Sequence, residues 1–110
     1  MLFRSGLVAR LVRAYHKSVP VLMQQLESAC ARHDSDAARH AAHTLKSSNE
    51  NLGAEQAADY FRRMEEAAMR RDFDALQAML AGAVALVQIV SAELDALTAP
   101  ALNQHSQELA

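Results

Sequence analysis

The stretch that decides the fold is Ala41–Ala54, which reads AAHTLKSSNENLGA. Placed on a helix at about 100° per residue, its apolar side chains fall within one sector about 100° wide. The predicted core face, extended one turn toward the N-terminus, consists of Ala38, Ala41, Ala42, Leu45, Asn49 and Leu52. His43 lies on the opposite face, with Lys46 three residues further along. Gly53 fits the end of this helix, because glycine readily adopts the left-handed conformation found after helix C-termini.

The polar face of this helix carries the candidate functional residues. A neutral imidazole is a competent nucleophile, and histidine is one of the residues that form covalent intermediates. If His43 accepted a phosphoryl group, Lys46, one turn along, would supply compensating charge. Ser47 could donate a hydrogen bond to the same group, and Arg39, four residues before His43, is the second cation within reach. An exposed histidine is usually only a surface residue, so this pattern alone leaves its function open.

The N-terminal part of the chain predicts two further helices. Apolar side chains recur at helical spacing between residues 3 and 16, which indicates a short first helix. Ser18 and Pro20 fit the cap and first turn of a second helix that runs to about residue 32. The segment 33–36, HDSD, then interrupts the apolar pattern and supplies a cap for the helix described above.

The C-terminal part predicts two more helices. The first runs from residue 54 to about 71 and forms a hairpin with the helix before it. The second begins after Asp72 and carries a long apolar seam of Phe73, Leu76, Leu80, Ala83, Val87, Val90, Leu94 and Leu97. We therefore predict an all-α domain at residues 1–99, an up-down four-helix bundle with an additional short N-terminal helix. Residues 100–110 are expected to be a loose C-terminal tail.

Composition narrows the classes of function. A chain of 110 residues suits one domain, and a net charge of −2 with no basic patch argues against nucleic acid as a partner. Cys30 is the single cysteine, which excludes an internal disulfide and fits a reducing compartment. We expect no apolar run to approach the roughly 18 residues of a membrane span, and the first residues do not resemble a secretory signal. The expectation is a cytoplasmic monomer without direct membrane insertion.

The segment His43–Ala54, HTLKSSNENLGA, resembles the signature of histidine-containing phosphotransfer (HPt) domains, which is roughly H-x-L-K-G-S-[SA]-x-x-L-G. The similarity extends over about residues 3–97. It implies a helical bundle that accepts a phosphoryl group from an aspartyl-phosphate on a receiver domain and passes it to another receiver. His43 corresponds to the phosphoacceptor and Lys46 to the lysine beside it. The resemblance implies a phosphoryl carrier and not an enzyme. Because nothing in the sequence resembles a nucleotide-binding loop, we do not expect the chain to phosphorylate itself from ATP.

The resemblance also implies partners and a cofactor. The partners are receiver domains, including those of hybrid sensor histidine kinases. We expect the receiver to supply both the aspartate and the Mg²⁺, because the sequence shows no acidic cluster to bind this ion. Two positions depart from the family pattern: Ser47 replaces the usual glycine, and Glu50 replaces a small residue about 10 Å along the helix from His43. Both lie on the expected docking face, where they bear on partner choice and transfer rate.

Two other functions stay open at this point. The chain could be an HPt-like binding module that docks a receiver or another signalling protein without carrying phosphate. It could also bind a metal through His33, His40 and His43. The second reading is disfavoured because a cap at residue 34 or 35 takes His33 off the helix, and two histidines make a poor metal site.

Overall fold

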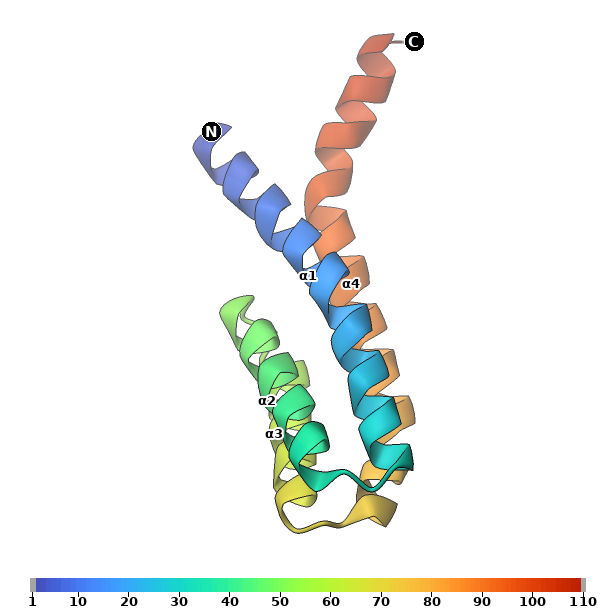
Figure 1. The fold of residues 1–110 in the computed structure, drawn as a ribbon. Coiled ribbons are helices and arrows are strands. Elements are labelled where there is room, and N and C mark those ends of the chain that lie inside the picture. The colour runs from blue at the N-terminus through green and yellow to red at the C-terminus, as the bar shows by residue number, and fades with distance from the viewer. Residues whose placement is uncertain (1, 110) are drawn as a thin grey trace.

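The computed structural model describes the backbone of residues 2–109 and the side chains of residues 6–98. The described chain forms four helices and no strand: α1 (Leu2–Ala31), α2 (Ser35–Asn51), α3 (Glu55–Met69) and α4 (Phe73–Leu109). Each helix packs against its neighbours in sequence, and α1 also packs against α4, which closes the bundle. The hairpin of α2 and α3 covers only one half of the longer pair of α1 and α4 (Figure 1). The predicted all-α class is confirmed.

The expected additional N-terminal helix is wrong, because α1 runs without a break from Leu2 to Ala31 and contains Pro20. Ser18 does not cap a new helix; its hydroxyl donates to the carbonyl oxygen of Ala14 at 2.9 Å. Pro20 removes one backbone hydrogen bond. The buried stripe nevertheless keeps the same phase on both sides of the proline, and its members are Val12, Tyr15, Val19, Met23 and Leu26. Burial of this stripe holds the two segments in one helix.

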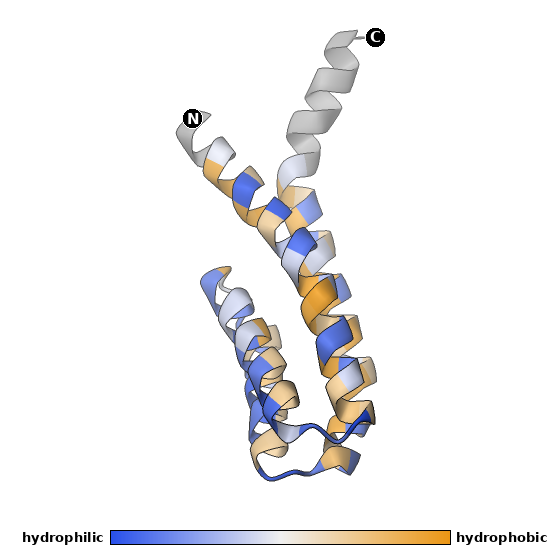
Figure 2. Ribbon diagram, viewed as in Figure 1, coloured by the Kyte–Doolittle hydropathy of each residue, from blue (hydrophilic) through white to orange (hydrophobic). Residues whose placement is uncertain are grey.

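The C-terminal helix differs from the expectation in two respects. Its backbone continues as α4 to Leu109, where a loose tail from residue 100 was expected; the domain boundary at residue 99 stays a prediction. The expectation that no apolar run approaches a membrane-spanning length is also wrong. The segment Phe73–Thr98 is long enough, and an 18-residue window within it is apolar enough, with a mean hydropathy of 1.8. Figure 2 shows its apolar residues beside those of α1. A single helix of this kind, with 17% of the window buried in the bundle, is only weak evidence of membrane insertion.

Five of the six residues predicted for this core face are buried, namely Ala38, Ala41, Ala42, Leu45 and Asn49, whereas Leu52, the C-cap residue, is half-buried. The amide of Asn49 is fully paired in this core. Its Oδ1 accepts from the Tyr15 hydroxyl at 2.9 Å, and its Nδ2 donates to the carbonyl oxygen of Leu45 at 2.8 Å. Burial raises the pKa of Tyr15 to about 12, and the hydrogen bond with Asn49 partly opposes this shift. A polar contact inside the core therefore fixes α1 against α2.

The three turns between the helices share one geometry. The second residue after each helix end has a positive φ: 55° at His33, 75° at Gly53 and 58° at Arg71. In the turn at Gly53, the N–H of Ala54 donates to the carbonyl oxygen of Asn49, which is the bond that closes a Schellman motif. The other two turns repeat this bond, and each continues into an aspartate cap. Asp34 accepts from the N–H of Ala37, and Asp72 accepts from that of Ala75.

A glycine allows α3 and α4 to approach closely. The Tyr60 hydroxyl of α3 donates to the carbonyl oxygen of Met79 in α4 at 2.9 Å. The Tyr60 ring lies directly over Gly82, where an added Cβ would be 2.8 Å from Cζ and closer still to the hydroxyl. The sequence offered no reason for a glycine at this position, since it lies off the seam of α4. The structure supplies one, because Tyr60 occupies the space of the missing side chain.

Candidate functional site

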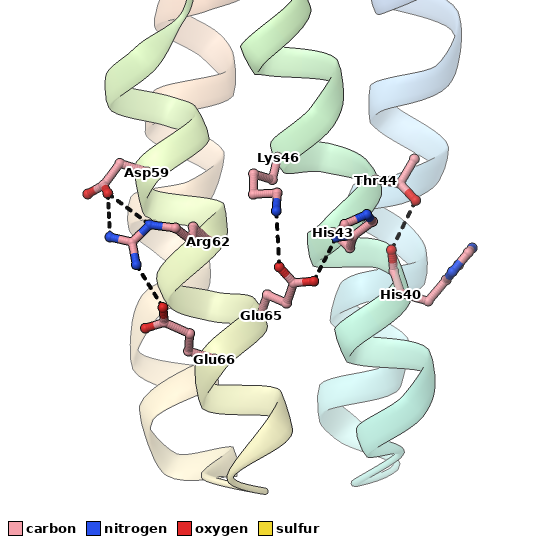
Figure 3. Close-up of polar contacts among 8 residues, drawn as sticks. All are labelled: His40, His43, Thr44, Lys46, Asp59, Arg62, Glu65 and Glu66. Carbon is pink, nitrogen blue, oxygen red and sulfur yellow. Dashed lines mark hydrogen bonds and ion pairs between the residues drawn. The ribbon is translucent and has the colours of Figure 1, made fainter.

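The polar face of α2 lies beside α3, as Figure 3 shows. The His43 side chain is 52% exposed, whereas that of Lys46 is only 19% exposed. Arg39 is exposed one turn before His43, and within the described residues it makes no side-chain hydrogen bond or ion pair. Ser47 is half-buried and Glu50 is exposed. The structure therefore brings His43 and Lys46 together and leaves Arg39 and Glu50 in solvent.

A carboxylate from α3 joins His43 to Lys46. Glu65 Oε2 lies 2.7 Å from His43 Nδ1, and Lys46 Nζ lies 3.4 Å from Glu65 Oε1. Only 14% of the Glu65 side chain is exposed, so this carboxylate sits in the groove between the two helices. A neutral imidazole that donates its Nδ1–H to the carboxylate keeps its lone pair on Nε2. The second ring nitrogen points away from Glu65 (Figure 3), where a partner can reach it.

The sequence reasoning missed Glu65. The hairpin register contains the signal that would have found it, because residues equally distant from an antiparallel turn lie opposite each other. His43 and Glu65 are 22 residues apart and equally distant from Ala54. Glu65 also follows the buried Met64, at the border of the α3 core stripe. These two features together indicate a carboxylate aimed at the face of His43.

The other charges on α3 pair among themselves. Arg62 donates to Asp59 at 2.6 Å and to Glu66 at 2.7 Å. These hydrogen bonds and charges lower the pKa of Asp59, with the bond from Arg62 as the largest cause. Arg62 is thus engaged along its own helix, as Figure 3 shows, while Glu65 faces α2. Glu65 is the α3 residue that reaches both His43 and Lys46.

The structure does not assemble the three histidines considered as metal ligands. His33 lies in the turn before α2, where its ring stacks on Phe73 with centroids 4.5 Å apart. His40 and His43 remain on α2. Within the described residues, no three histidine, cysteine, aspartate or glutamate side chains are grouped so that they could hold a metal ion. The described residues therefore do not bring together the three histidines that the sequence offered as metal ligands.

The comparison with protein families agrees with this geometry. A family model described as the Hpt domain matches residues 10–104. This match covers most of the chain, so the chain belongs to the Hpt domain family. Membership implies histidine phosphotransfer in two-component signalling, carried out by a phosphoryl carrier and not by a true enzyme. Members of this family interact with receiver domains. No curated protein and no solved structure matches the chain significantly.

Proposed function

We propose that His43 is the phosphoacceptor of a phosphorelay, which takes a phosphoryl group from a receiver-domain aspartyl-phosphate and passes it to a second receiver. The observation that carries this proposal is the exposed imidazole held at Nδ1 by Glu65. Membership in the Hpt domain family supplies the reaction class. We also propose a cytoplasmic location, in keeping with receiver domains as partners.

The transfer step follows from the ring's two nitrogens. The Nε2 lone pair of His43 attacks phosphorus, an N–P bond forms, and the P–O bond to the receiver aspartate breaks. The aspartate carboxylate leaves with the electron pair of that bond. The proton on Nδ1 stays in its hydrogen bond with Glu65, whose negative charge stabilises the positive charge that develops on the ring. The reverse sequence of bonds transfers the group to the second receiver.

Lys46 is proposed to stabilise the phosphoryl oxygens. Its ammonium group lies 3.4 Å from Glu65, one helical turn from His43, on a flexible four-carbon stem. Glu65 holds this cation beside the ring before the phosphoryl group arrives. Mg²⁺ is assigned to the receiver, where it would neutralise the phosphoryl charge during transfer.

Arg39, Ser47 and Glu50 are proposed to select the receiver. Ser47 stands one turn beyond His43, where the family signature has glycine, so its hydroxymethyl group narrows the approach to the ring. Glu50 lines a shallow pocket of about 200 Å³ with Glu55, Ala58, Asp59 and Arg62. Ser47→Gly and Glu50→Ala should each change the order of preference among a set of phosphorylated receivers. If wild type and both variants show the same order of preference, Ser47 and Glu50 do not select the receiver.

The phosphoacceptor is tested by incubating the chain with a radiolabelled, phosphorylated receiver. His43→Gln should abolish transfer of the label. His40→Gln is the matched control, because His40 is also exposed on α2, one turn away, and it should leave transfer intact. Lys46→Ala should fold normally and transfer more slowly. Retention of label by the His43→Gln variant would overturn the assignment.

The second candidate function is a binding module that docks receivers without carrying phosphate. Ser47 favours this reading, because it occupies the glycine position closest to the histidine. A stable complex with a receiver, together with no acid-labile phosphohistidine on the chain, would establish the second function and exclude the first.

A further inference from the structure

Two helices extend beyond the part of the bundle that the hairpin covers. The molecule is 54 Å long, whereas α2 has 17 residues and is about 26 Å long at 1.5 Å per residue. In Figure 1, the N-terminal half of α1 and the C-terminal half of α4 continue past the hairpin and diverge. We call the described part of this extension the stem, which comprises residues 6–14 of α1 and 89–98 of α4.

The apolar seam of the bundle continues into the stem without cover. On α4, Val90 and Leu94 are buried, but the next seam residue, Leu97, is 66% exposed. On α1, Val12 is buried, whereas Leu11 and Leu7, one and two turns from Tyr15, are 41% and 49% exposed. Leu11 faces the hairpin side of α1, because it lines a small groove with residues of α2. The face of α1 and α4 that the α2–α3 hairpin covers in the rest of the bundle is therefore exposed on the stem.

The two helices of the stem carry opposite charges. In the stem, α1 contains Arg10 and Arg13 and no carboxylate, and Lys17 lies one turn further along the helix. From residue 75 to residue 98, α4 contains Glu93 and Asp95 and no lysine or arginine. Among the described residues, His16 Nε2 of α1 lies 2.9 Å from Asp95 Oδ1 of α4, and this contact joins the two helices. The remaining charges flank the exposed leucines.

We propose that the stem binds the stem of a second copy of this chain. A two-fold axis that sets α1 of one copy beside α4 of the other brings basic and acidic residues together twice, as an isologous interface requires. Two stems then form a short four-helix bundle that covers the leucines of both. Each stem contributes only nine residues of α1 and ten residues of α4, so the interface is small for a specific one and association should be reversible. This proposal replaces the monomer expected from the sequence.

The proposed interface is separate from the phosphotransfer site. Tyr15, at the base of the stem, binds Asn49 of α2. His43 lies six residues before Asn49, which places it about 9 Å along α2 from Asn49, in the direction away from the stem. Both imidazoles of a dimer would remain open to receivers. Association and phosphotransfer can therefore be measured independently, and failure of one does not imply failure of the other.

Analytical ultracentrifugation of the full chain tests the proposal. The mass should rise from 12.0 kDa at low concentration toward twice that value at high concentration. Leu97→Glu should keep the chain monomeric at concentrations where wild type is dimeric. Met69→Glu is the matched control, because Met69 is equally exposed but lies at the far end of α3. A single mass of 12.0 kDa at every concentration, or equal weakening by both variants, would overturn the proposal.

Charge reversal tests whether the partner of the stem is a second copy of this chain. A variant with Arg10→Glu and Arg13→Glu should associate less than wild type, and so should Glu93→Lys. An equimolar mixture of the two variants should restore association, because opposite charges again face each other in the mixed dimer. Failure of the mixture to associate would overturn the pairing of α1 with α4. A monomer that instead binds vesicles of phosphatidylcholine and phosphatidylglycerol would assign the stem to a membrane and would also overturn the proposal.

Discussion

Glu65→Ala removes the carboxylate that contacts both His43 and Lys46. A hydrogen bond to a charged group contributes about 1.5–3 kcal/mol, and the bond to His43 is short, at 2.7 Å. We take the lower end, about 1.5 kcal/mol, because the His43 side chain is half exposed. If this stabilisation is expressed in the transition state, phosphotransfer should slow about tenfold. Glu65→Gln should have a smaller effect, because its amide oxygen still accepts the Nδ1 proton but carries no charge.

The assay follows transfer of label from a phosphorylated receiver to the chain in single turnover. Glu66→Ala is the control, because Glu66 is the next residue on α3 but pairs with Arg62 instead of His43. Nitrogen NMR of the His43 ring provides a second measurement. The proton should reside on Nδ1 in wild type, and the Glu65→Ala variant should shift the population toward Nε2–H. Unchanged transfer and an unchanged tautomer in that variant would refute the positioning role of Glu65.

Three further predictions concern the scaffold. Burial raises the pKa of Tyr15 from 10.0 to about 12, so the unfolded chain loses this proton first as the pH rises. The contribution of Tyr15 to the free energy of unfolding is therefore fully present below pH 10 and should decrease by about 3 kcal/mol as the pH rises toward 12. Urea titrations of Tyr15→Phe should not show this decrease. Gly82→Ala should lower the free energy of unfolding by about 1–3 kcal/mol, although alanine has the better helix propensity. Adding Tyr60→Phe to this variant should restore part of the lost stability. A Gly82→Ala variant more stable than wild type would contradict the close approach of Tyr60 to Gly82. Burial raises the pKa of the Cys30 thiol, so alkylation should be slow in the native chain and fast in denaturant; equal rates would show that the thiol is accessible.

The burial pattern and the end of α2 could be predicted from the sequence. The burial of Leu45 and the exposure of His43 follow from a helical period of 3.6 residues, and Gly53 ends the helix as its conformational freedom predicts. These features depend on residues within one helix and the turn after it. Local periodicity and turn chemistry are sufficient for them.

The features that the sequence missed depend on other helices. Ser18 and Pro20 are correct local signals for a helix start, but continuous burial along α1 overrides them. Glu65 acquires its role only because the hairpin places it opposite His43. Gly82 has no local explanation, since the Tyr60 ring that fills its space belongs to α3. Each of these requires knowledge of which helix faces which.

The most direct test of the central claim is to locate the phosphoryl group on the chain after incubation with a phosphorylated receiver. Phosphorus NMR of the phosphorylated protein distinguishes the two ring nitrogens, and peptide mapping under alkaline conditions identifies the residue. The account predicts an acid-labile phosphoryl group on Nε2 of His43, because Nδ1 is bound to Glu65. A phosphoryl group on Nδ1, on another residue, or on none would contradict it.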